Sequence, residues 1–179
     1  MFEKAIKKAF NLSKIPSKEE LVKFDGYDVL DKEHAIQIFL GKSWEEIYKR
    51  ISLSESNMDD PSNYKRFLSQ KLGTQSDIED LQVLESYGLQ YYLQSYLLYL
   101  VSKGCQPRNT DDFTLFLIGT LKEIFRIQGR EVFTDEQCLV LKQITTSLLK
   151  ELENSPSNEE EYVYVKPMKE NLSFIESIL

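Results

Sequence analysis

Glycine and proline are scarce in this chain, with 7 and 5 residues among 179. Loop-rich β-sandwiches and barrels need more turn residues than this, so the composition favours helices. The two cysteines, Cys105 and Cys138, are too far apart for a CxxC motif or a zinc-binding spacing. We therefore expect two reduced thiols in a cytoplasmic protein.

Long apolar runs are also lacking. The longest, at 113–121, is about half the length of a membrane-spanning helix. The first ten residues, MFEKAIKKAF, have no continuous apolar core of the kind found in signal peptides. We expect a soluble protein that does not associate with a membrane.

Positively charged residues are fewer than negatively charged ones: the chain has 22 lysines and arginines and 29 aspartates and glutamates. The net charge is −7. Such a chain repels phosphate groups, whose neutralisation provides much of the affinity for nucleic acids. We expect no nucleic-acid partner.

The chain contains a single histidine, His34. It could act as a base toward Cys105 or Cys138, but neither cysteine lies in a recognisable nucleophile motif, so a solvated or boundary histidine is the simpler interpretation. Di-metal helical bundles use Glu-x-x-His motifs, which Glu33-His34 does not match. No glycine cluster forms a phosphate-binding loop. We expect no catalytic residue, no metal and no cofactor.

Helices are predicted along most of the chain, because apolar residues recur at intervals of three and four. Capping boxes mark helix starts at 17–20, 43–46 and 134–137. Asp31 is expected to cap a helix that ends at Gly41.

From residue 60 onward the sequence predicts helices and one short strand. Asp60-Pro61 is expected to open a helix that ends at Gly73. Another helix is expected from about Ser76, which either continues into the tyrosine stretch or breaks near Gly88. EYVYV at 161–165 alternates like a short strand, and Pro167 is expected to open the last helix.

These patterns predict an all-α protein, an orthogonal or irregular bundle of about six to eight helices with one short strand near the C-terminus. The helical domain is expected to span residues 1–154. Residues 155–179 are expected to form an acidic linker, over 155–161, and a C-terminal helix that packs on the same domain.

Five tyrosines lie in the stretch YGLQYYLQSYLLYL at 87–100. On a helix, Tyr92, Tyr96 and Tyr99 form a stripe beside the leucines, with Gln94 and Ser95 on the opposite side. A ring at the edge of a core can be buried while its hydroxyl reaches water or a neighbour. Base stacking needs a cationic groove beside the rings, which the surrounding sequence lacks. We expect scaffold tyrosines at the core boundary, with a partner interface as the alternative.

The same region resembles the centre of a bacterial domain family of unknown function. LESYGLQYYLQSYLLYL at 84–100 is similar to the family's tyrosine-leucine-proline-alanine-tyrosine-leucine helix, with Gln94 in place of the proline. AIKKAF at 5–10 resembles the family's opening, FLGKSWEEI at 39–47 its glycine-lysine-x-tryptophan block, and FTDEQCLVLKQITTSLL at 133–149 its closing T-x-x-Q helix. The resemblance implies a bacterial protein that shares the family's fold. It implies no functional residues, because the family has no assigned activity.

The function expected from these observations is a non-catalytic protein-binding module. Its negative charge favours a cationic partner, and a toxin-neutralising immunity protein is one member of this class. The candidate partner-binding residues form two acidic patches and the tyrosine stripe: Asp77, Glu79 and Asp80; Glu159, Glu160 and Glu161; Tyr92, Tyr96 and Tyr99. The alternative is a small-molecule-binding protein or enzyme with an uncharged, tyrosine-lined pocket.

Overall fold

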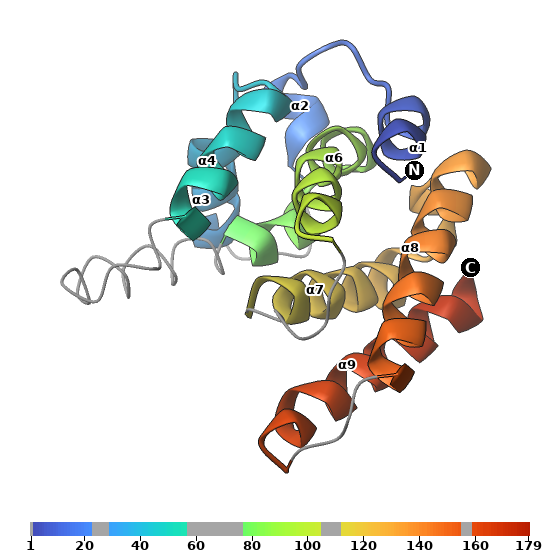
Figure 1. Ribbon diagram of the computed structural model, residues 1–179. Coiled ribbons are helices and arrows are strands. Elements are labelled where there is room, and N and C mark those ends of the chain that lie inside the picture. Colours follow the sequence, from blue (N-terminus) through green and yellow to red (C-terminus); the bar gives the residue numbers. More distant parts are fainter. Residues whose placement is uncertain (1, 23–28, 57–76, 105–111, 155–158) are drawn as a thin grey trace, which may run out of the picture. The chain divides into compact units, whose positions relative to one another are not determined.

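The computed structural model describes residues 2–22, 29–56, 77–104, 112–154 and 159–179 (Figure 1). Most of these residues are helical, which confirms the all-α prediction. In these ranges the only β-type pairing is an isolated antiparallel bridge between Val22 and Leu84. None of the described helices is both long enough and apolar enough to cross a membrane.

The chain divides into two compact units. We call Phe10–Tyr99 the middle unit, and Met1–Ala9 together with Leu100–Leu179 the terminal unit. The helix expected between Asp60 and Gly73 lies outside the described residues.

The middle unit is built from helices of unequal length: α2 (Lys18–Leu21), α3 (Val29–Phe39), α4 (Trp44–Ser56), the 3-10 helix η3 (Asp80–Val83) and most of α6 (Ser86–Ser102). Two predicted capping boxes are confirmed here. The Glu20 carboxylate accepts a hydrogen bond from the Ser17 amide at 2.9 Å, and Glu46 accepts one from the Ser43 amide at 2.6 Å.

The start of α3 differs from the prediction. The helix begins at Val29, so Asp31 lies inside its first turn and does not cap it. A carboxylate in this position still complements the positive end of the helix dipole. The predicted end is confirmed, because Gly41 follows the helix with a φ of 74°. This left-handed conformation favours glycine.

Helix α6 is buried along the whole of residues 91–100. Gln94 and Ser95 are buried as well, although we expected them on a polar face. Ser95 is satisfied inside the protein, since its hydroxyl donates to the carbonyl oxygen of Trp44 at 2.7 Å. Ser95 therefore attaches α6 to the backbone at the start of α4.

The chain is not helical at Leu84 and Glu85, so the break before α6 lies ahead of Gly88, and the helix from about Ser76 does not continue into the tyrosine stretch. Gly88 lies inside the helix, where a Cβ atom would meet the carbonyl oxygens of Glu20 and Leu21 at 3.1 Å. The Glu85 amide donates to the carbonyl oxygen of Leu21 at 2.9 Å. The absence of a side chain at Gly88 thus allows α6 to pack directly on the end of α2.

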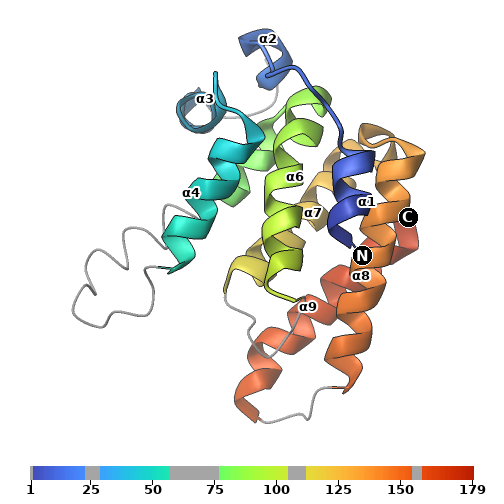
Figure 2. The same cartoon turned by 45° about the horizontal axis from the view of Figure 1, so that its top comes forward.

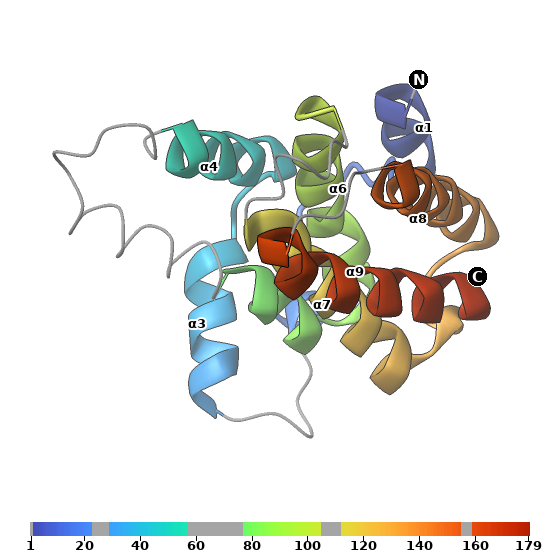
Figure 3. The ribbon, with the colours of Figure 1, turned by 60° about the horizontal axis from the view of Figure 1, so that its bottom comes forward.

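The terminal unit contains α1 (Phe2–Ala9), α7 (Asp112–Gln128), the 3-10 helix η5 (Arg130–Val132), α8 (Asp135–Asn154) and α9 (Glu159–Ile178). Helix α1 lies alongside α8 (Figure 2), and α9 packs against α7 and α8 (Figure 3). The third capping box is confirmed, because Gln137 Oε1 accepts from the Thr134 amide at 3.0 Å.

Three predictions about the C-terminal segment are wrong. Helix α9 begins at Glu159 and continues through Pro167. The strand expected at 161–165 is therefore wrong, Pro167 does not open the helix, and residues 159–161 belong to the helix and not to a linker. Met168, Leu172 and Ile175 are buried at intervals of four and three. Burial of this helical stripe outweighs the strand preference of the short tyrosine-valine alternation.

Candidate functional site

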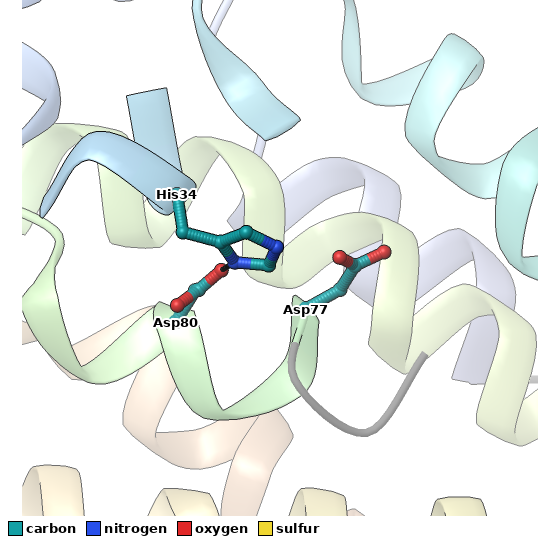
Figure 4. Close-up of side chains that lie close together, drawn as sticks. All are labelled: His34, Asp77 and Asp80. Atoms are coloured by element: carbon teal, nitrogen blue, oxygen red, sulfur yellow. Dashed lines mark hydrogen bonds and ion pairs between the residues drawn. The ribbon is translucent and has the colours of Figure 1, made fainter. Parts of the chain in front are cut away.

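Three polar residues of the middle unit that are distant in sequence lie together in the structure. His34 is on α3, Asp80 is the first residue of η3, and Asp77 precedes Asp80 by one helical turn (Figure 4). One nitrogen or oxygen atom from each lies within 4.8 Å of the other two. The packing of α3 against η3 brings them together. We call these three residues the His34 cluster.

His34 and Asp80 form a close pair. His34 Nδ1 lies 2.5 Å from Asp80 Oδ2, and the side chains are 40% and 8% exposed. In a neutral imidazole, a proton on Nδ1 that is donated to Asp80 leaves Nε2 with a free lone pair. Burial raises the pKa of the Asp80 carboxyl, and the hydrogen bond with His34 opposes this shift.

Asp77 is the most constrained carboxylate of the cluster. Its Oδ2 lies 2.8 Å from Arg50 Nη2, in a side chain that is only 10% exposed. Burial raises the pKa of the Asp77 carboxyl to about 6, against the opposing effect of Arg50. Its Oδ1 is buried and has no hydrogen-bond partner within the described part of the chain. An unsatisfied buried acceptor is uncommon and costs free energy.

Charged residues surround the cluster and leave it negative. Asp31 and Glu79 are exposed, and both act electrostatically on Asp80. Arg50 and Lys42 act in the opposite sense on Asp77. A concentration of negative charge of this kind attracts cations, so the arrangement is suited to binding a positively charged group.

The first predicted acidic patch is therefore only partly exposed. Glu79 faces solvent, but Asp77 and Asp80 are both 7% exposed. The expectation that they form an open surface is wrong, because Asp77 pairs with Arg50 and Asp80 with His34. The second patch, Glu159, Glu160 and Glu161, forms the start of α9, and the structure does not describe these side chains.

The tyrosine stripe lies in the core. Tyr92, Tyr96 and Tyr99 are all buried, so they do not form an exposed surface for a partner. The Tyr92 hydroxyl lies 2.6 Å from the carbonyl oxygen of Phe39, and the Tyr96 hydroxyl lies 3.3 Å from that of Asp77. These tyrosines serve as scaffold, and Tyr96 also helps to fix the backbone of the His34 cluster.

Sequence reasoning missed the position of His34 beside Asp77 and Asp80. Asp77 and Asp80 are three residues apart, a spacing that places both on one side of a helix. No local pattern connects them with His34, which lies 46 residues before Asp80. Only the tertiary packing of α3 on η3 reveals the cluster.

Comparisons of the chain with protein-family models, with curated proteins and with solved structures find no match. The resemblance to a bacterial family of unknown function therefore stays a prediction.

Proposed function

We propose that this chain is a non-catalytic binding module that recognises a positively charged partner protein. The observation that carries the proposal concerns two exposed acids, Asp31 on α3 and Glu79 directly before η3, which both act electrostatically on the buried Asp80. We call Asp31 and Glu79 the α3–η3 acids. A lysine- or arginine-rich surface on the partner complements them.

The charge of the whole chain supports this assignment. A net charge of −7 attracts a basic protein over a distance and speeds the encounter. The buried carboxylates behind the α3–η3 acids add to the local negative potential without being exposed themselves. A basic toxin is one partner of this class, in which case the chain acts as its immunity protein.

Partner capture with matched variants tests the proposal. The wild-type protein, Asp31→Lys/Glu79→Lys and the control Glu33→Lys/Glu153→Lys are immobilised, and proteins from the native host are captured and identified. Both double variants change the net charge equally, and the four residues are exposed. Glu33 follows Asp31 by two positions on α3, about 200° around the helix.

We expect the wild type and the control to retain the same basic partner and the Asp31→Lys/Glu79→Lys protein to lose it. Equal retention by all three proteins contradicts the assignment of the surface. Retention of an acidic partner contradicts the proposed charge complementarity.

The alternative of a tyrosine-lined ligand pocket gains no support from the contacts. The hydroxyls of Tyr92 and Tyr96 lie at hydrogen-bonding distance from backbone carbonyl oxygens of the protein itself. They are engaged in holding the fold.

A further inference from the structure

The His34 cluster contains nitrogen and oxygen atoms that could bind a metal ion. We propose that His34 and Asp77 bind one divalent transition-metal ion of the Zn²⁺ class, and that Asp80 positions the imidazole ring of His34. This inference does not depend on the partner-binding proposal, because the proposed ligands belong to the His34 cluster and are not the exposed α3–η3 acids.

The arrangement of His34 and Asp80 matches a metal-binding histidine. Imidazole nitrogen and carboxylate oxygen are both common ligands of Zn²⁺ and related ions. A metal-bound histidine usually donates its other N–H to a carboxylate, which fixes the tautomer and the ring orientation. Asp80 Oδ2 lies 2.5 Å from Nδ1 in this way. Figure 4 shows Asp80 and Asp77 on opposite sides of the imidazole ring, with the remaining nitrogen facing the Asp77 side.

Asp77 provides an independent indication of a ligand. Its Oδ1 is buried and has no hydrogen-bond partner among the residues that the structure describes. The other oxygen, Oδ2, is held by Arg50 at 2.8 Å. A cation bound at Oδ1 satisfies an acceptor that otherwise costs free energy. An ordinary solvated cluster of acids has no such buried, unsatisfied atom.

The spacing of the His34 cluster is close to that of a metal site. Ligand atoms at about 2.1 Å from one ion can be no more than about 4.2 Å apart, and one ligand atom from each of the three residues lies within 4.8 Å of the other two. The His34 side chain is 40% exposed, so its ring has room for a small adjustment around an ion. The exposed side of the ring also leaves space for water to complete the coordination.

The local charge suits a divalent ion. Asp77 and Asp80 repel each other when ionised, and Asp31 and Glu79 add to the negative charge at Asp80, whereas Arg50 and Lys42 oppose it at Asp77. A bound cation reduces the repulsion among these carboxylates. Arg50 competes for Asp77, but it occupies Oδ2 and leaves Oδ1 to the ion.

The test uses the fact that His34 is the only histidine of the chain. A two-bond ¹H–¹⁵N spectrum of tag-free, ¹⁵N-labelled protein shows a single imidazole at mildly alkaline pH and identifies its tautomer. We expect a proton on Nδ1 and, on titration with Zn²⁺, a shift of the Nε2 resonance that saturates at one equivalent. An imidazole that is unshifted by one equivalent of Zn²⁺ overturns the proposal.

Variants then assign the ligands by calorimetric titration with Zn²⁺. We expect His34→Gln and Asp77→Asn to abolish the binding, and Asp80→Asn to weaken it about tenfold or more by releasing the ring. Glu33→Gln removes an exposed charge from the same helix and should bind as the wild type does. Unchanged affinity in Asp77→Asn overturns the assignment of Asp77 as a ligand. The wild-type spectrum decides the existence of the site even if a variant fails to fold.

Discussion

The hydroxyl oxygen of Tyr92 lies 2.6 Å from the carbonyl oxygen of Phe39, the last residue of α3. The final carbonyl groups of a helix have no partner within the helix. The Phe39 carbonyl accepts here from the Lys42 amide, at 3.1 Å, and from this tyrosine of α6. The same hydroxyl lies 2.8 Å from the carbonyl oxygen of Lys42. It is therefore within hydrogen-bonding distance of two carbonyl groups in the segment that joins α3 to α4. Because α3 carries His34, this contact also helps to hold the His34 cluster in place.

Loss of this hydroxyl should destabilise the middle unit. Tyr92→Phe removes the hydroxyl that bonds both carbonyl groups, although the Phe39 carbonyl still accepts from the Lys42 amide at 3.1 Å. We expect the free energy of unfolding to fall by about 0.5–1.5 kcal/mol. Tyr87→Phe is the matched control, because the Tyr87 hydroxyl donates to the carbonyl oxygen of Lys14 at 2.8 Å in an exposed position. Water can replace that bond, so the control should lose less. Urea denaturation measures both, and an equal loss contradicts the capping role of Tyr92.

Two helical glycines should respond to alanine in opposite ways. Alanine in a helix interior is favoured over glycine by about 0.5–1 kcal/mol. At Gly119 in α7 the nearest atom to a new Cβ, Asn171 Nδ2, lies 3.9 Å away, so Gly119→Ala should realise this gain. At Gly88 the new Cβ meets backbone atoms of Glu20 and Leu21 at 3.1 Å, and backbone cannot move aside as a side chain can.

We therefore expect Gly119→Ala to raise the free energy of unfolding and Gly88→Ala to lower it. Thermal or urea unfolding of the two variants beside the wild type measures the sign of each change. Stabilisation by Gly88→Ala shows that α2 and α6 are not in the close contact described.

Alkaline pH should reveal the buried tyrosines. Burial raises the pKa of Tyr92 and raises that of Tyr96 well above the ordinary value of 10.0. The unfolded chain loses these protons near pH 10, whereas the native protein retains them. The contribution of the two buried tyrosines to the free energy of unfolding is thus complete below about pH 10. It is lost as the pH rises through their pKa values in the folded protein.

The titration is followed by tyrosinate absorbance. In the folded protein the amplitude near pH 10 should be the same for the wild type and Tyr92→Phe, because Tyr92 does not ionise there. Loss of about one-tenth of the signal, the share of one among 10 tyrosines, means that Tyr92 ionises normally and is not buried.

Features encoded within a few residues could be predicted from the sequence. Each capping box joins residues three positions apart, and all three are present, as in the pair Thr134 and Gln137. Gly41 ends α3 as expected, because the left-handed turn is a local requirement. These interactions need no information about the tertiary fold.

Features that depend on packing could not be predicted in this way. The alternation at 161–165 is compatible with a strand, but the contacts of α9 with α7 and α8 select a helix. The exposure of Asp77 and Asp80 was misjudged for the same reason, since their partners Arg50 and His34 lie on other elements. The His34 cluster exists only where α3 meets η3.

The association rate of the captured partner, measured by stopped flow at several salt concentrations, tests the central claim about function most directly. We predict that wild-type association slows steeply as salt is added, because screening acts over about 8–10 Å near physiological ionic strength. At low salt, Asp31→Lys/Glu79→Lys should associate at least about tenfold more slowly, while Glu33→Lys/Glu153→Lys should stay close to the wild type. A wild-type association rate that does not change with salt concentration contradicts recognition of a cationic partner by the α3–η3 acids. Equal association rates for the two double variants contradict it as well.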